Sequence, residues 1–148
     1  MYAPANDVMP TLIDWMGLDV PRACNGHSLL PFLRGEKPEN WRTEVFWEHD
    51  FRDVVSQRPE TALGLGSDDC CYAVIRDAHY KYVHFAKLPP LLFNLNEDRC
   101  EMNNIAASPG AKEIVLRYAQ KMLTWRLVQA DRTFTNMHLS KDGLYVRS

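Results

Sequence analysis

The clearest alternation of hydrophobic and polar positions runs from Cys71 to Phe85. Two short runs of β-branched and aromatic residues flank the polar segment from Arg76 to His79, a pattern that predicts a β-hairpin. Neither face of its second strand, residues 80–85, is clearly polar, whereas a strand with one solvated face alternates apolar and charged side chains. We therefore expect both faces to be covered, one by a helix of this chain and the other by a second body.

Two helical segments are predicted before the hairpin. Asn6 or Asp7 is a suitable cap for a short apolar helix, and Gly17 ends it. Residues 28–33 then predict a single helical turn, which Gly35 closes. Because the first helix is short and very apolar, its exposed face needs a partner.

The remaining elements complete a small sheet and its cover. Residues 43–51 and 91–95 predict two further strands, and residues 52–69, with one proline and two glycines, predict a long irregular segment. Ser108 begins the signal for the longest helix, about residues 111–129. Apolar residues at helical spacing give that helix one stripe, made of Ile114, Val115, Tyr118, Met122 and Trp125.

These elements predict an α+β fold. A small antiparallel sheet of about four strands packs against one long C-terminal helix, with an additional short N-terminal helix. We expect one domain over residues 1–148, in which 1–35 form the N-terminal helix and loop, 36–130 the sheet and long helix, and 131–148 a tail. The tail is too polar for a core of its own and resembles an arm that docks on another surface.

Composition restricts the partners rather than the fold. The 148 residues include 46% hydrophobic and 24% charged residues, and the formal net charge is −2. Such a balance provides no general attraction for nucleic acid or anionic membranes. The N-terminus lacks the basic and apolar regions of a signal peptide. We therefore expect a cytoplasmic protein with no nucleic-acid or membrane partner.

The four cysteines do not predict a metal site. Cys24, Cys70, Cys71 and Cys100 show no C-x-x-C spacing, which argues against a zinc ribbon. The neighbours Cys70 and Cys71 point to opposite faces of a strand, so we expect one buried thiol and one exposed thiol.

Glu48, His49 and Asp50 form the most suggestive cluster of polar residues. In a strand Glu48 and Asp50 share one face and can approach the same cation, while His49 points away. Two carboxylates alone make a poor metal site, and the alternative is a strand edge whose charges meet solvent or Arg52. We assign no metal ligand and no catalytic residue to this chain.

The order of several segments resembles a known family. DVMPTLIDWMGLDVP, then NGHSLLPFLRGE, then YKYVHF and PPLLFNLNEDRCEMNNIA resemble the C-terminal third of sulfatases in the alkaline phosphatase superfamily. WRTEVFWEHDFRD and KMLTWRLVQADRTFT look like the phosphonate monoester hydrolase and arylsulfatase branch. The resemblance covers Asp7 to about Thr135. Three positions depart from the family pattern: His27 replaces Arg, Asn94 replaces Asp, and Arg99-Cys100 replaces a turn.

The resemblance also shows what is missing. The intact family uses a divalent metal and a formylglycine, which is made from the Cys of a C-x-P-S-R motif. None of the four cysteines is followed by that pattern, and the family's metal-binding Asp residues have no counterpart here. The resemblance therefore implies a C-terminal subdomain without the active site, which carries no cofactor and is inactive alone.

Three functions remain open on this basis. The first is a non-catalytic domain that serves assembly or shapes a substrate cleft, with Glu48, His49, Asp50 and Arg52 as cleft residues. The alternative is a metal-dependent hydrolase of sulfate or phosphonate esters, whose site is shared in an oligomer and uses Glu48, Asp50 and a histidine. The third is a plain oligomerisation module. The expected partner is a second copy of the chain or a catalytic domain.

Overall fold

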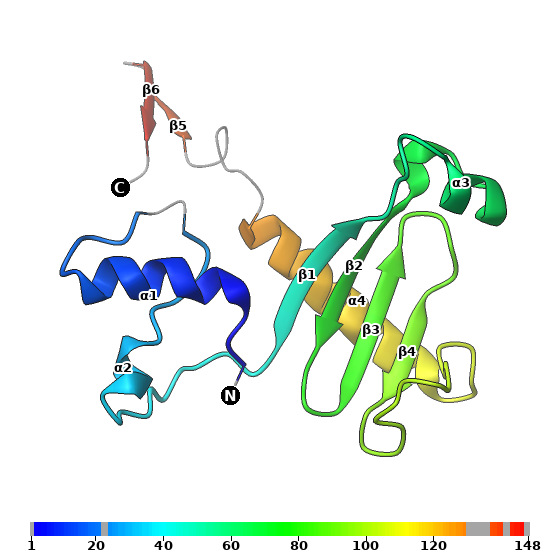
Figure 1. Ribbon diagram of the computed structural model, residues 1–148, viewed down its shortest axis with the longest axis horizontal. Coiled ribbons are helices and arrows are strands. Elements are labelled where there is room, and N and C mark those ends of the chain that lie inside the picture. Colours follow the sequence, from blue (N-terminus) through cyan, green and yellow to red (C-terminus); the bar gives the residue numbers. More distant parts are fainter. Residues whose placement is uncertain (1, 22–23, 130–136, 141–142, 147–148) are drawn as a thin grey trace.

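The computed structural model describes residues 2–21, 24–129, 137–140 and 143–146. A four-stranded antiparallel sheet stands in front of one long helix, and two shorter helices lie to the side of the first strand (Figure 1). The predicted α+β class is therefore confirmed.

The sheet has the strand order β1-β2-β3-β4, so each strand pairs with its neighbours in the sequence. Its strands are β1 (Val45–Asp50), β2 (Cys71–Arg76), β3 (Tyr80–Phe85) and β4 (Leu91–Asn94). The predicted hairpin is β2 and β3. The register places one row of large side chains across the sheet: Phe46, Ile75, Tyr82 and Leu92.

Helix α4 (Ala111–Gln129) covers that row and forms the main core. Tyr118 and Met122 are almost fully buried, and the Trp125 ring stacks on Phe46 with ring centroids 5.0 Å apart. Full burial of such a side chain stabilises the fold by about 1.5–3 kcal/mol. The predicted stripe is confirmed, but the residue before the helix is Gly110, in a left-handed conformation, rather than a capping Ser108.

The predicted irregular segment 52–69 contains regular structure. Helix α3 (Arg58–Leu63) and the 3-10 turn η2 (Ser67–Asp69) occupy half of it. Pro59 lies in the first turn of α3, and Gly64 with φ of +65° ends it. The sequence prediction was wrong because proline and glycine disfavour the interior of a helix, whereas here Pro59 and Gly64 lie at the two ends of α3, where both are tolerated.

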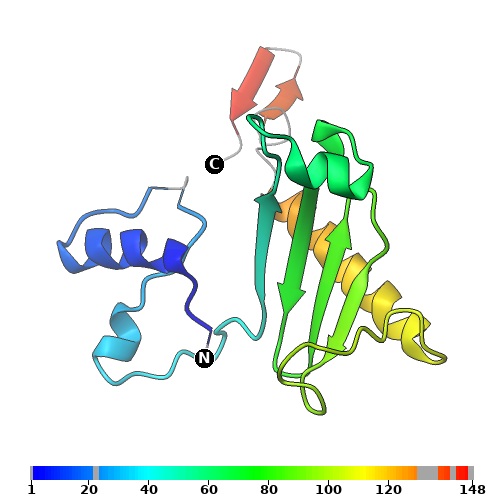
Figure 2. The ribbon, with the colours of Figure 1, turned by 45° about the vertical axis from the view of Figure 1, so that its right-hand side comes forward.

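The second face of the sheet is partly covered by the chain itself. Val74 and Val83 on this face are buried, and α3 crosses the upper ends of β2 and β3 on the side away from α4 (Figure 2). After β4 the chain turns back, so that Glu101 pairs with Lys81 and lies 3.3 Å from Arg76. These two positions are therefore covered within the chain, and cover of the rest of this face by a second body stays a prediction.

The N-terminal unit contains η1 (Ala5–Asp7), α1 (Val8–Trp15) and α2 (Leu30–Leu33). The predicted capping role of Asp7 is wrong, because its backbone is already helical and its side chain makes no cap bond. At the other end, Gly17 adopts a φ of +73° and ends α1 as predicted. A Cβ atom on Gly26 would lie 2.1 Å from the Asn6 carbonyl oxygen, so the close approach of these two segments requires glycine.

The predicted tail is described only in part. Strands β5 (Met137–Ser140) and β6 (Gly143–Val146) pair as an antiparallel hairpin, while residues 130–136, 141–142 and 147–148 lie outside the described residues. Docking of this arm stays a prediction. In the described part of the chain, no helix combines the length and apolarity that a membrane crossing requires.

Candidate functional site

Strand β1 positions three of the four predicted cleft residues. Because side chains alternate along a strand, Glu48 and Asp50 share the face on which Phe46 packs against α4, and His49 lies on the other face. Glu48 forms an ion pair with Arg126 of α4, in which Glu48 Oε1 lies 2.9 Å from Arg126 Nε. The predicted separation of the two carboxylates from the histidine is therefore present.

Arg52 holds Asp50 in one orientation. Its Nη2 lies 2.6 Å from Asp50 Oδ2, its backbone N–H donates to Oδ1, and its Nη1 lies 3.3 Å from Asp68 Oδ1. The hydrogen bonds from the Arg52 guanidinium and backbone hold the pKa of Asp50 below its usual range. Asp50 is therefore an ionised, exposed group that is poorly suited to act as a general acid.

His49 belongs to an aromatic row on the face away from α4. Its ring centroid lies 5.4 Å from that of Tyr72, and Tyr72 lies 5.4 Å from Phe85 and 6.0 Å from Phe51. Aromatic rings at these separations attract one another and bury apolar area. The structure thus gives His49 a packing partner, on the opposite face from the two carboxylates.

A cavity of about 440 Å³ lies at the end of β1, and it includes residues that the sequence prediction missed. Its lining contains Glu48, His49, Asp50, Cys71, His84 and Arg126. The alternation along residues 80–85 already placed His84 on the same face as Tyr82. Only the strand register shows that His84 and Glu48 lie on either side of Ala73, which pairs with both. Arg126 lies four residues after Met122, a spacing that keeps it beside the buried stripe.

The chemistry of this cavity is limited. The described residues include no group of three or more His, Cys, Asp or Glu side chains that could hold a metal ion. His84 Nδ1 lies 3.0 Å from the Tyr82 hydroxyl, and both carboxylates are paired with arginines. The divalent metal and formylglycine of the resembled family therefore do not fit these residues. The arrangement can hold polar groups, but it assembles no nucleophile with its base.

The cysteines agree with the sequence prediction. Cys70 is fully buried and Cys71 is exposed, and all four cysteines are free thiols. Burial raises the pKa of the Cys70 thiol, and the nearby Glu60 carboxylate raises it further. A thiol in this state is a weak nucleophile.

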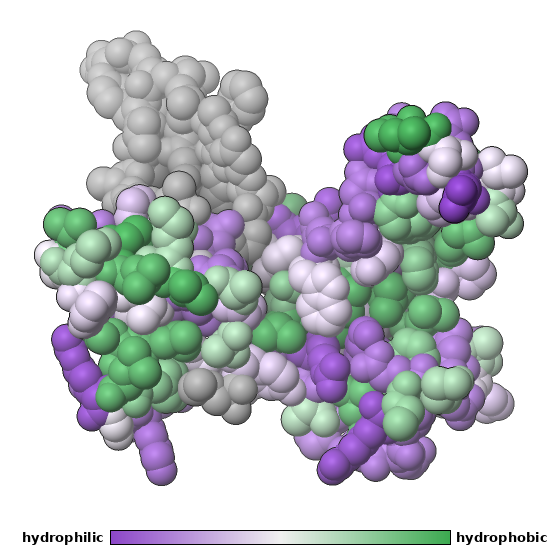
Figure 3. All heavy atoms as spheres, viewed as in Figure 1, coloured by the Kyte–Doolittle hydropathy of each residue, from purple (hydrophilic) through white to green (hydrophobic). Residues whose placement is uncertain are grey.

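A second candidate surface covers α1 and α2. Figure 3 shows hydrophobic side chains gathered over these two helices. Seven large apolar residues of this region are at least 50% exposed: Val8, Met9, Leu12, Trp15, Met16, Leu18 and Leu33. Between the helices lies a depression of about 560 Å³ that Leu12, Trp15 and Leu33 line. We call the seven exposed residues the α1–α2 surface.

The N-terminal unit is tied to β1 through a buried carboxylate. Asp7, which is fully buried, accepts a hydrogen bond of 2.9 Å from the His27 backbone and pairs with Arg42 at 2.8 Å. Arg42 also lies 2.6 Å from His27 Nδ1. Because Arg42 is three residues before β1, this cluster helps to fix the α1–α2 surface relative to the sheet.

Comparison with known proteins connects these features. The family described as "N-sulphoglucosamine sulphohydrolase, C-terminal" matches residues 3–128. The multifunctional alkaline phosphatase superfamily protein PehA of Trinickia caryophylli is 50% identical over 147 residues, which are 99% of this chain and 29% of that protein. Human arylsulfatase K is 31% identical over 107 residues, 68% of this chain and 18% of that protein.

Solved structures show the same fold. The phosphonate monoester hydrolase of Agrobacterium radiobacter superposes with a TM-score of 0.81 at 44% identity, over 96% of this chain and 28% of that one. The phosphonate monoester hydrolase from Silicibacter pomeroyi gives a TM-score of 0.81 at 34% identity, over 96% of this chain and 29% of that one.

The chain thus spans less than a third of the length of these relatives. Its match runs through the sheet, the long helix and the N-terminal unit. The chain belongs to the sulphohydrolase C-terminal domain family, within the sulfatases and phosphonate monoester hydrolases of the alkaline phosphatase superfamily.

Proposed function

We propose that this domain completes a catalytic domain of the same family and has no activity of its own. Together the two parts would hydrolyse sulfate or phosphonate esters, and this domain would serve assembly and shape the substrate cleft. The observation that carries the proposal is the α1–α2 surface, together with the 71% of PehA that this chain does not span.

The α1–α2 surface has the properties of half an interface. Trp15 is 71% exposed and Leu33 is 75% exposed, although both lie on short, regular helices. Each square ångström of apolar surface removed from water contributes roughly 25 cal/mol, and contiguous patches of this kind mark sites of association. The Asp7–Arg42 pair presents the surface in a fixed position. A catalytic domain is its proposed occupant.

The end of β1 is proposed as a wall of the substrate cleft. Glu48 and Asp50 are held by Arg126 and Arg52, so their oxygens are already oriented before a substrate arrives. Oriented charges discriminate between substrates without taking part in bond cleavage. We propose that they contact the parts of the substrate that lie away from the reacting ester.

The test is reconstitution. This chain, with an affinity tag, is co-expressed with the remaining portion of PehA from Trinickia caryophylli, and hydrolysis of an aryl phosphonate monoester and an aryl sulfate is measured with Mn²⁺ or Ca²⁺. We expect co-purification and metal-dependent turnover by the pair, and none above buffer by this chain alone.

A matched pair of variants locates the interface. Leu12 in α1 is 50% exposed and Leu116 in α4 is 59% exposed. Leu12→Asp is expected to abolish co-purification, whereas Leu116→Asp retains it. Equal loss with both variants, or retention with both, would contradict the assigned surface. Metal-dependent turnover by this chain alone, lost in Glu48→Ala, would instead establish the shared-site hydrolase.

A further inference from the structure

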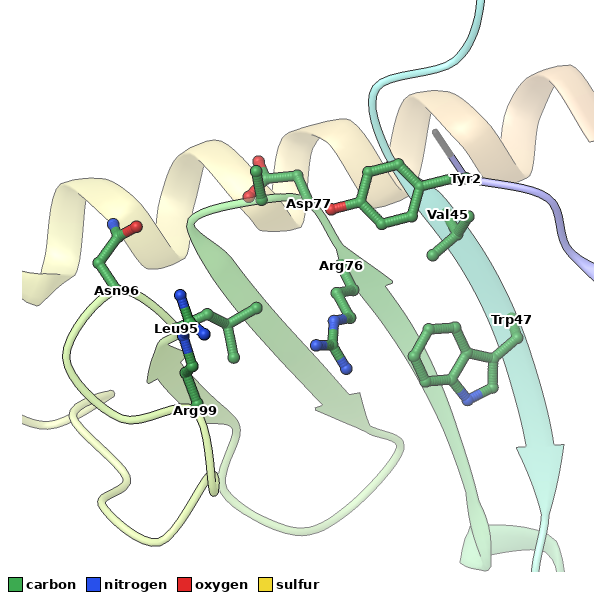
Figure 4. A pocket seen from close by; sticks show the side chains of 9 residues that line it. Tyr2, Val45, Trp47, Arg76, Asp77, Leu95, Asn96 and Arg99 are labelled. Carbon is green, nitrogen blue, oxygen red and sulfur yellow. The ribbon is translucent and has the colours of Figure 1, made fainter.

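A second cavity, of about 660 Å³, opens on the face of the sheet away from α4, at the end of the strands opposite to Asp50. Figure 4 shows its lining side chains. The Trp47 indole and Val45 stand on one side, and Leu95 and Arg99 on the other, with the Arg76 guanidinium between them. A volume of this size suits a small-molecule ligand.

The walls combine an aromatic plane with two guanidinium groups. Trp47 is 38% exposed, so its ring is accessible from the cavity although it lies within a strand. Arg76 comes from the end of β2 and is held 3.3 Å from Glu101, which restricts the orientation of its guanidinium. Arg99 comes from the turn after β4, is exposed, and forms no ion pair with the described residues.

The local charge favours an anion. Two cations, Arg76 and Arg99, line the cavity, and the Lys81 Nζ lies 6.0 Å from the centroid of the Trp47 ring. The two nearby carboxylates already have partners. Glu101 pairs with Arg76 and Lys81, and Asp77 accepts hydrogen bonds from the Tyr118 hydroxyl and from two backbone N–H groups. The charge of Arg99 therefore remains available to a ligand.

We propose that this cavity binds a small aromatic acid, meaning a single aromatic ring that carries a carboxylate, sulfate, sulfonate or phosphate group. The ring packs against the Trp47 indole, and the oxyanion accepts hydrogen bonds from Arg76 and Arg99. Arginine is suited to this role because its planar fork matches the oxygens of such groups. Leu95 and Val45 supply the apolar part of the contact.

The proposal requires both parts of the ligand. An inorganic anion lacks the ring, and a neutral arene lacks the charge, so each should bind more weakly than the aromatic acid. The site also does not involve the α1–α2 surface, so it can be tested in the chain alone, whatever the outcome of the reconstitution experiment.

The experiment is an NMR titration of the ¹⁵N-labelled chain with benzenesulfonate, sodium sulfate and benzyl alcohol at constant ionic strength. We expect saturable shifts of the Trp47 indole N–H and the Arg76 and Arg99 side-chain N–H signals with benzenesulfonate. Arg99→Gln is expected to weaken binding about tenfold, as loss of one charged hydrogen bond would. Trp47→Leu should reduce the preference for benzenesulfonate over sulfate.

The control is Arg117→Gln, which makes the same change of charge at an exposed residue on α4. Its affinity for benzenesulfonate should equal that of the unaltered chain. The proposal is overturned if no saturable shift occurs, if sulfate binds as tightly as benzenesulfonate, or if Arg117→Gln weakens binding as much as Arg99→Gln. Thermal denaturation of each variant verifies that it is folded.

Discussion

Asp7 illustrates, at the scale of single residues, where sequence reasoning reaches its limit. Its residue type and its place before an apolar run favour a helix cap, yet its carboxylate binds His27 and Arg42 instead. These partners lie 20 and 35 residues further along the chain. Local propensity cannot predict such a contact, because it depends on how the loop between α1 and β1 returns.

Asp77 and Tyr118 connect the hairpin turn to the long helix. The Tyr118 hydroxyl donates to Asp77 Oδ2 at 2.5 Å, and the backbone N–H groups of His79 and Tyr80 donate to Oδ1. Burial raises the pKa of Asp77, but these hydrogen bonds outweigh it and hold the pKa below its ordinary value. Ionised Asp77 is therefore part of the stable fold.

This arrangement predicts a dependence of stability on pH. Because the pKa of Asp77 is lower in the folded state than in the unfolded state, where it is about 4, ionised Asp77 stabilises the fold fully at a pH above this unfolded-state value. This stability is lost as the pH falls through the folded-state pKa. Tyr118→Phe should reduce the free energy of unfolding at pH 7 by about 1–2 kcal/mol. It should also make the loss of stability between about pH 5 and pH 2 smaller.

Urea denaturation at a series of pH values measures both effects. Tyr72→Phe is the matched control, since the Tyr72 hydroxyl makes no hydrogen bond to the described residues. An unchanged pH profile in Tyr118→Phe would show that the Tyr118 hydroxyl does not set the pKa of Asp77.

At the scale of elements, periodicity predicted most of the fold. The strands, the hairpin and α4 follow from alternation and from apolar residues at helical spacing, because their packing is decided by which face is buried. Helix α3 was missed because it is short and because Pro59 and Gly64, which mark its ends, are also typical of loops. The part of the second sheet face that the chain itself covers was not predicted, since Glu101 reaches Lys81 from a segment without periodicity.

Two neighbouring residues of α4 test the assigned core. Met122 is 4% exposed and Leu123 is 61% exposed, although they differ by one position. Met122→Ala should reduce the free energy of unfolding by about 2–5 kcal/mol, because it leaves a cavity against the sheet. Leu123→Ala should change it by less than about 0.5 kcal/mol. Equal effects in urea denaturation would contradict the burial of the Met122 face of α4 against the sheet.

The candidate site was predicted in part. The separation of Glu48 and Asp50 from His49 follows from strand geometry alone. The pairing of Glu48 with Arg126 does not, because it depends on how far α4 extends across the sheet. The anion-binding cavity was not predicted either. Trp47, Arg76 and Arg99 come from three separate segments, which the strand register and the turn after β4 bring together.

At the scale of the whole molecule, the α1–α2 surface is the feature that the proposed function uses. Trp15, Leu33 and their neighbours expose apolar area that a catalytic domain is proposed to cover. When that partner is absent, a second copy of this chain is the available alternative. We therefore expect the isolated chain to associate with itself through this surface.

Sedimentation velocity over a range of concentrations measures this association. The mean mass of the unaltered chain should rise with concentration, and the double variant Leu12→Asp with Leu33→Asp should remain monomeric. Leu116→Asp with Leu123→Asp places the same charges on exposed positions of α4 and should leave the association unchanged. Association that persists in the first variant would assign it to another surface.

The sequential strand order also has a consequence for how the domain folds. Strands β2, β3 and β4 are joined by the short segments 77–79 and 86–90, so their pairing requires little loop-closure entropy. Strand β1 joins β2 only after residues 51–70 have closed a longer loop. Contacts between nearby residues form fastest, and we therefore expect β1 to be the last strand to assemble. Because β1 is an edge strand, loss of the strand that carries Glu48 and Asp50 leaves β2, β3 and β4 paired.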